Sequence, residues 1–366
     1  MMINDYKDKY NEITRTFMRM LSESRKDENI VFSPLSIIML LAIASDAADG
    51  VSREVIDRVL GTDISHEELM GLFKELQSVF SKDERLISSN AVCVREDIKD
   101  SIVPEYEDRL KEMFDGKLFS SKDIVSDVNA WVKEKTKGMI QDIADESMNQ
   151  MVAALINAIA FESDWAEKYD EDDIDDGDFH NADGTESEVK MLSSTEGSYI
   201  ENDLFTGFIK PYKGLDYSFM ALLPKDGESA SFNKRCIEDI DFSGLFHSAS
   251  YIKVYVDMPE FKYDFGEELT SICKELGINT VFTPCAVFLP MSSEQLMVDS
   301  IIHKAHIEVD RKGTKAAAAT MGVMCLGCAP MMEDYKEVNL DRPFTYAIMH
   351  NETGFPVFAG VFNKAE

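Results

Sequence analysis

A helix without a polar side is the feature that most restricts how this chain can fold. Ser33 followed by Pro34 fits a helix start, because serine caps free backbone N–H groups and proline is tolerated in the first turn. From Leu35 to Ala44 the residues are then apolar nearly all round. Such a helix must be surrounded by other elements, so we expect it at the centre of a core and not on its surface.

The elements around this helix change in kind along the chain. Apolar residues at helical spacing predict further helices in the first part, at Tyr6–Ser24, Ser52–Leu60, His66–Ser81, Ile102–Phe114 and Ile124–Lys135. Strand material is expected at Asn90–Val94, Leu155–Glu162, Phe208–Leu223, Tyr251–Met258, Ala305–Val309, Phe344–Ile348 and Phe355–Phe362. Helices first and strands later, without strict alternation, predict an α+β fold. No repeat or long linker divides the sequence, so we expect one domain over residues 1–366.

Composition narrows the class of protein. Hydrophobic residues make up 45% of the chain, which is enough for a sizeable core. The net charge of −31 argues against nucleic acid and anionic membranes as partners, because phosphate binding needs clustered Lys and Arg. No apolar run approaches the roughly 20 residues that cross a bilayer. Met1 to Lys9 are polar and charged and show no secretory signal, although a trimmed chain would look the same.

The sequence lacks the motifs of common enzyme classes, since it contains no H-E-x-x-H, G-x-S-x-G, Walker loop or G-x-G-x-x-G. His303 and His306 lie three apart on a strand-like segment, so they face opposite ways and make a poor metal pair. The acidic run Asp170–Asp178 lacks EF-hand spacing and is expected to be a solvated loop. We therefore expect no enzyme, no catalytic residue, no metal and no cofactor.

Cysteine usage does not indicate a disulfide scaffold. Four of the six cysteines are isolated and are expected to be buried or half-buried small hydrophobes: Cys93, Cys236, Cys273 and Cys285. Cys325 and Cys328 form a C-x-x-C motif in an uncharged stretch. A redox centre needs a βα setting that lowers the thiol pKa, so a redox enzyme is the disfavoured alternative.

The stretch from Ala316 to Met332 contains no charged residue, although 29% of the chain is charged. It consists of Ala, Thr and Gly with a few Met, in contrast to the bulky residues of the core helix. Read at period two, one face carries only uncharged residues, so the segment could lie between two strands without burying charge. A short alanine helix is the alternative, and local propensity favours it.

Short segments along the chain match a known family in sequence, order and spacing. They begin with Val31–Ser36 and the helix behind it, and they end with Asp341–Phe344. Between these lie Asn129–Ile140, Leu155–Phe161 with Trp165, Pro211–Tyr212, Leu222–Pro224, Met258–Phe261, and Ile302–Ala305 read through to Gly313–Thr314 and the alanines. Together they cover nearly the whole length, and by them the chain resembles the serpins.

The resemblance implies a suicide inhibitor of proteases. The implied serpin fold has a large central, mostly antiparallel sheet with helices packed on it, smaller barrel-like sheets and an exposed reactive loop, here within residues 311–340. A protease cleaves the loop and forms an acyl-enzyme, and the freed loop then inserts as a new strand. Small residues suit such a hinge, because a large or charged group would stall insertion. The hinge positions are Gly313, Thr314, Ala316, Ala317, Ala318, Ala319 and Thr320.

Further roles carry over from the family's motifs. Ser33, Ser36, Asn157 and His303 resemble the polar cluster under the opening of the sheet, which the family calls the shutter. A buried polar cluster has to be hydrogen-bonded, so we expect His303 to be a structural histidine. Trp165 resembles the tryptophan beneath the point where insertion starts, the breach.

Two breach positions depart from the family pattern. Arg311 stands where the family usually has an acidic residue, and Glu260 stands where it usually has lysine. We expect an ion pair between Glu260 and Arg311 with the two signs exchanged. A largely exposed pair of this kind contributes about 0–1 kcal/mol to stability.

The position of the cleaved bond depends on which end of the loop is counted. The family's usual spacing from Gly313 puts the bond after Gly327, and counting back from Pro343 puts it after Met332. We rely on the first count, because the length of the inserted strand determines where the protease is held. The candidates are Leu326, Gly327 and Cys328, with Met331 and Met332 behind them.

These candidates are small or apolar, so the expected partner is an elastase-like or chymotrypsin-like serine protease, with a cysteine protease as the alternative. A Cys325–Cys328 disulfide that blocks the loop until it is reduced, and two independent thiols, both stay open. A non-inhibitory serpin acting as substrate, carrier or chaperone-like protein is the alternative function. We expect a monomer that is extracellular by family resemblance, with the cytoplasm as the alternative location.

Overall fold

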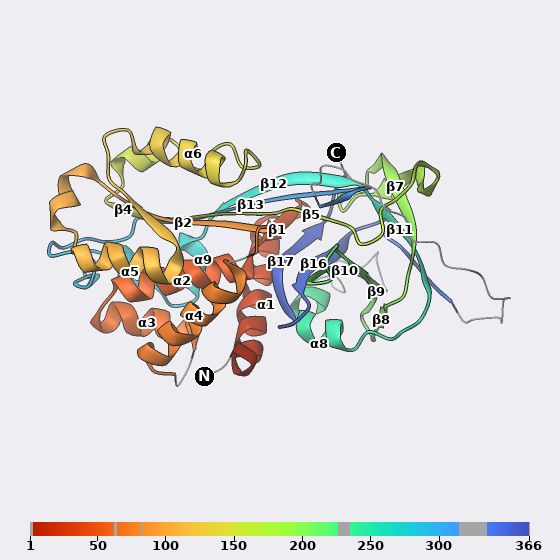
Figure 1. Cartoon of the computed structure of the whole chain (residues 1–366), viewed down its shortest axis with the longest axis horizontal. Coiled ribbons are helices and arrows are strands. Elements are labelled where there is room, and N and C mark those ends of the chain that lie inside the picture. Colours follow the sequence, from red (N-terminus) through yellow and green to blue (C-terminus); the bar gives the residue numbers. More distant parts are fainter. Residues whose placement is uncertain (1–2, 62–63, 82, 226–234, 315–334, 366) are drawn as a thin grey trace. The chain divides into compact units, whose positions relative to one another are not determined.

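The computed structural model describes the chain except for residues 1–2, 62–63, 82, 226–234, 315–334 and 366 (Figure 1). The chain divides into two compact units, each assembled from three separate segments. The first comprises Met1–Phe17, Phe32–Phe161 and Asp264–His306, and the second Met18–Val31, Glu162–Tyr263 and Ile307–Glu366. Helix α1 (Lys7–Ser24) and strands β1 (Ile30–Phe32), β12 (Phe261–Glu268) and β13 (Ser300–Asp310) contribute residues to both. The single domain expected over residues 1–366 stays a prediction.

The predicted core helix is the centre of the first unit. Helix α2 (Pro34–Ala47) is buried at every residue, as its unbroken apolar surface requires. Ser33 caps it, since its side chain accepts a hydrogen bond from the backbone N–H of Ser36. Around it pack α3 (Gly50–Leu60), α4 (His66–Phe80), α5 (Pro104–Phe114) and strand β4 (Ala153–Phe161). Shorter helices of this unit are η1 (Ile3–Tyr6), η2 (Glu96–Ser101), η3 (Glu146–Gln150), α9 (Thr270–Glu275) and η5 (Thr280–Phe282).

The sheet of the first unit has β4 in its middle. Strand β2 (Leu86–Val94) pairs with β4 in antiparallel fashion, while β3 (Gly116–Phe119) and the first part of β13 add parallel pairs. Helix α6 (Ile124–Lys135) lies on one face of β2 and β4, and α2 lies on the other (Figure 1). Coverage on both faces explains why all nine residues of β4 are buried.

The second unit is built mostly from strands. One sheet has the order β1-β17-β16-β10-β9-β8, and another has the order β15-β11-β7-β6. The strands are β6 (Ile174–His180), β7 (Glu186–Glu196), β8 (Tyr199–Glu201), β9 (Phe205–Pro211), β10 (Tyr217–Pro224), β11 (Val254–Pro259), β15 (Lys336–Asn339), β16 (Phe344–His350) and β17 (Phe355–Phe362). The short helices η4 (Glu171–Asp173) and α8 (Phe242–His247) also belong to it.

The structure corrects three local predictions. Phe208–Leu223 is not one run of strand, because β9 and β10 are separate antiparallel strands joined by a turn. The acidic run Asp170–Asp178 is not a loop, because it forms η4 and most of β6. Cys285 is exposed, while Cys93, Cys236 and Cys273 are buried as expected. Among the helices that the structure describes, none combines the length and the apolar character needed to cross a bilayer.

Candidate functional site

The predicted hinge begins inside a sheet, at residues that belong to the second unit. Strand β14 (Gly313–Thr314) pairs with Val309 and Asp310 of β13 on one side and with β5 (Ser163–Asp164) on the other. A Cβ atom on Gly313 would lie 2.2 Å from the carbonyl oxygen of Ser163. Glycine is therefore required here by the close approach of β5, in addition to any bending that the hinge undergoes.

Thr314 is fully buried. We call the position of β14 between β13 and β5 the seat of β14. The Oγ1 of Thr314 lies 2.6 Å from the hydroxyl oxygen of Tyr212. The Tyr212 ring is stacked on Trp165, with ring centroids 4.5 Å apart and planes 9° apart. Trp165 in turn donates from Nε1 to the carbonyl oxygen of Asp310 at 2.8 Å. The sequence-predicted Trp165 thus lies against the residues that lead into the hinge.

Glu260 and Arg311, whose charges are exchanged relative to the family pattern, are also in contact, but the contact is a hydrogen bond to the backbone and not an ion pair. The contact that the structure shows runs from the backbone N–H of Arg311 to Oε1 of Glu260, at 3.0 Å. A backbone donor does not depend on the side chain of residue 311. The charge of the Arg311 guanidinium is therefore not needed for this contact.

The residues predicted to form the shutter come together in the first unit because of strand register. Asn157 of β4 lies opposite Asn90 of β2 and opposite His303 of β13, so the three form one row across the sheet. Nδ2 of Asn157 donates to Oδ1 of Asn90 at 2.9 Å, and Asn157 Oδ1 lies 3.1 Å from Nδ1 of His303. Ser33 donates its backbone N–H to Nε2 of His303 at 3.1 Å. Ser36 joins through its backbone N–H, which Ser33 Oγ accepts.

His303 is held as a neutral ring. Its Nε2 accepts a hydrogen bond from the backbone N–H of Ser33, and its Nδ1 faces the side-chain carbonyl oxygen of Asn157. This is the pattern of the Nδ1–H tautomer. Complete burial lowers the pKa of His303 to about 3, because a charged ring would lose its hydration. The prediction of a hydrogen-bonded structural histidine agrees with this geometry.

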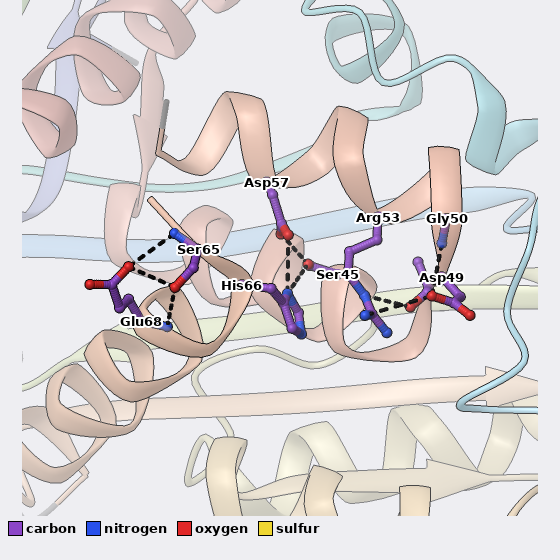
Figure 2. Close-up of polar contacts among 9 residues, drawn as sticks. Ser45, Asp49, Gly50, Arg53, Asp57, Ser65, His66 and Glu68 are labelled. Carbon is purple, nitrogen blue, oxygen red and sulfur yellow. Dashed lines mark hydrogen bonds and ion pairs between the residues drawn. The ribbon is translucent and has the colours of Figure 1, made fainter. Parts of the chain in front are cut away.

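A serine, a histidine and an aspartate also approach one another where α2, α3 and α4 meet (Figure 2). Nδ1 of His66 lies 3.3 Å from Ser45 Oγ and 3.1 Å from Asp57 Oδ2, and Ser45 Oγ also donates to Asp57. A catalytic triad needs serine and aspartate on different ring nitrogens, whereas here both face the same one. Ser45 is moreover fully buried, so the cluster ties the helices together and offers no nucleophile.

The remaining predicted loop positions lie outside the described residues. They are the hinge alanines Ala316–Ala319 and Thr320, the bond candidates Leu326, Gly327, Cys328, Met331 and Met332, and Cys325, the other cysteine of the C-x-x-C motif. Within the part of the chain that is described, no group of three or more His, Cys, Asp or Glu side chains is arranged to hold a metal ion.

Sequence reasoning missed two members of these sites. Asn90 completes the shutter row and donates onward to the carbonyl oxygen of Phe114, and Tyr212 connects Trp165 to Thr314. A polar Asn90 directly before the apolar run Ala91–Val94 was a usable signal, because a buried amide needs partners. Tyr212 carried no such signal beyond its place in a matching segment.

Comparison with known proteins agrees with this architecture. The model of the family described as "Serpin (serine protease inhibitor)" matches residues 8–365. Leukocyte elastase inhibitor A of Mus musculus is 30% identical over 364 residues, which is 93% of this chain and 94% of that protein. The native-state structure of tengpin, a thermophilic serpin, matches with a TM-score of 0.87 at 29% identity and covers 98% of this chain and 94% of that one.

A solved structure with lower sequence identity shares the fold alone. Human thyroxine-binding globulin matches with a TM-score of 0.87 at 19% identity, covering 99% of both chains. Serpins as a family are protease inhibitors and not enzymes. The family model spans nearly the whole sequence and the solved serpins share its α+β arrangement, so this chain belongs to the serpin family.

Proposed function

We propose that this serpin inhibits a serine protease by acting as a suicide substrate. The segment after Thr314 serves as bait, and after cleavage it extends the strand that Gly313 and Thr314 have already begun. The observation that carries the proposal is the position of β14 between β13 and β5, followed after Lys315 by the uncharged stretch from Ala316 to Met332.

The chemistry belongs to the protease, and this chain supplies the acyl group. The catalytic serine oxygen of the protease attacks the carbonyl carbon of the bait residue, the C–N bond breaks, and the new amine leaves with a proton. An ester then joins the protease to the upstream part of the loop. Insertion of that part carries the protease away from its original position before water hydrolyses the ester.

The buried position of Thr314 explains why the residues that follow on the same face of the inserting strand, beginning with Ala316 and Ala318, must be small and uncharged. Thr314 is fully buried between two strands, and its hydroxyl is satisfied by Tyr212. A charged side chain in such an environment would lose its hydration without a partner. Gly327 lies thirteen positions after Thr314, which corresponds to about 43 Å of extended strand.

The residues around the expected bond favour an elastase-like or chymotrypsin-like target. Leu326, Gly327 and Cys328 offer small or apolar groups, whereas a trypsin-like protease selects Arg or Lys. Two relatives that are 30% and 31% identical to this chain are leukocyte elastase inhibitors, which supports an elastase as the first protease to test.

The test is to incubate the chain with elastase, with chymotrypsin and, for comparison, with trypsin and a cysteine protease. We expect an adduct that resists SDS with elastase or chymotrypsin, and a melting temperature that rises when the loop is cleaved. Cleavage without an adduct and without a rise in melting temperature would refute the proposal and favour a non-inhibitory serpin.

A matched pair of variants ties the result to the seat of β14. Thr314→Arg places a charge in the buried seat, and we expect the protease to cleave this variant without being trapped. Thr195→Arg makes the same change at an exposed position of β7 and should trap normally. Equal trapping by the two variants would show that the seat is not part of the mechanism.

A further inference from the structure

A buried ion pair lies beside the hinge and has no role in the mechanism so far. Lys210, near the end of β9, and Glu196, the last residue of β7, are joined at 2.7 Å between Nζ and Oε1. Their side chains are only 3% and 9% exposed. Two buried charges are costly to dehydrate, and replacing such a pair by apolar residues is often neutral or stabilising. Stability alone is therefore a weak reason for its presence.

The lysine of the ion pair contacts two aromatic rings. Nζ of Lys210 lies 4.4 Å from the ring centroid of Tyr169 and 5.5 Å from that of Trp165. On the other side of the pair, Ser194 donates to Glu196 Oε1 at 2.8 Å and lies 3.4 Å from the Tyr169 hydroxyl. A desolvated cation is attracted to ring faces more strongly than an exposed one, so Lys210 holds both rings in place.

The same two aromatic residues hold the turn before the hinge. Trp165 donates from Nε1 to the carbonyl oxygen of Asp310 at 2.8 Å and from its backbone N–H to that of Lys312 at 2.9 Å. Tyr169 donates its backbone N–H to the carbonyl oxygen of Arg311 at 3.0 Å. Three consecutive carbonyl groups, immediately ahead of Gly313, are thus bound by the two residues whose rings flank Lys210.

We propose that Lys210 is a positioning residue that, together with Glu196, sets how readily this turn releases β14. The inference rests on the proposed function, because release matters only if the loop inserts. Lys210 does not touch the turn itself and acts through Trp165 and Tyr169. With the cation in place the two rings stay fixed, which keeps the Trp165 ring N–H and the backbone N–H groups of Trp165 and Tyr169 bound to the three carbonyl groups, so the strands open slowly.

The test removes the pair without leaving a buried charge unpaired. Lys210→Met keeps an unbranched stem, and Glu196→Gln keeps the shape of the side chain, so the double variant loses both charges and little volume. A matched control is the double variant Lys190→Met with Asp176→Asn, which removes an exposed pair between β7 and the neighbouring β6. Lys210→Arg is the conservative variant that retains the cation.

Two quantities are measured on each purified chain. The first is the rate at which trapping of elastase or chymotrypsin is lost during incubation without protease. The second is the quenching of Trp165 fluorescence by acrylamide in a Trp131→Phe background, since the chain has two tryptophans. We expect the Lys210/Glu196 double variant to lose activity about tenfold faster, equivalent to about 1.4 kcal/mol of barrier, and to show stronger quenching. The exposed-pair control and Lys210→Arg should match the unaltered chain.

Two results would overturn the inference. One is a rate and a quenching equal to those of the exposed-pair control. The other is an equal fall in the melting temperatures of the intact and the loop-cleaved chain with an unchanged rate, which is the mark of a merely structural pair. If the unaltered chain traps neither protease, the proposed function is what fails. The quenching comparison needs no protease and still decides whether Lys210 holds the rings. If the double variant does not fold, Lys210→Met alone repeats the test, because it removes the cation that contacts the two rings.

Discussion

Acidification should weaken the native state through the buried ring of His303. Burial lowers the pKa of this ring to about 3, whereas an unfolded histidine has a pKa of about 6.5. The unfolded chain therefore takes up a proton at a pH where the folded chain does not. The stabilisation due to the neutral ring is complete above pH of about 6.5 and is lost progressively as the pH falls toward about 3.

The size of the effect follows from the two pKa values. Between about pH 7.5 and about pH 5.5 the unfolded ring changes from about one-tenth to about nine-tenths protonated, while the folded ring stays neutral. Linkage then gives a loss of about 1.4 kcal/mol in the free energy of unfolding over this interval. The result depends on the unfolded pKa, and it holds as long as the folded pKa lies well below 5.5.

The assay is urea unfolding of the unaltered chain and of His303→Gln at the two pH values. Glutamine keeps a donor and an acceptor but does not titrate, so all other acidic groups contribute equally to both chains. The unaltered chain should lose about 1.4 kcal/mol more than the variant. Equal losses, or a His303 resonance that titrates near 6.5 in NMR spectra of the folded chain, would refute the reasoning.

Three further predictions follow from the same contacts. Asn157→Ala leaves the buried hydrogen-bonding groups of its neighbours without a partner and should lower the free energy of unfolding by about 3 kcal/mol; a urea-measured loss under about 1 kcal/mol would contradict this. Gly313→Ala places a Cβ atom against the Ser163 carbonyl oxygen and should lower the free energy of unfolding by about 1–3 kcal/mol. It should also raise the fraction of protease that escapes trapping. A variant with unchanged stability and unchanged trapping would argue against close packing around Gly313. Glu260→Ala should speed spontaneous loss of activity more than Arg311→Ala, because only the first removes the acceptor of the backbone N–H; the opposite order would restore the ion-pair hypothesis.

Sequence patterns predicted the helices and the buried strands well, because their signal lies within the element itself. The all-round apolar run became the wholly buried α2, and Phe355–Phe362 became β17 with the same bounds. The charged strands β6 and β7 were missed or read as loop, since β6 is an edge strand and its acidic side chains mask the alternation. The turn between β9 and β10 was missed because apolar residues continue close to it on both sides.

The sequence allowed us to predict which residues belong to the site, but not which other residues they contact. The resemblance named Asn157, His303 and Trp165, and the structure places each in a satisfied polar or aromatic contact. Their partners Asn90 and Tyr212 come from segments that are far away in the sequence. No local pattern indicates such pairs.

The chain's residue order is enough to specify an all-apolar helix, an uncharged segment and a glycine ahead of it, since periodicity, charge and side-chain size are properties of neighbouring residues. Folding adds the pairings. Strand register puts Asn90, Asn157 and His303 in one row, brings β5 against Gly313, and turns Glu260 toward the backbone of Arg311 and not toward its charge. Register is set by packing across the whole sheet, where a shift of one residue would reverse every side chain, and so these contacts exist only in the folded molecule.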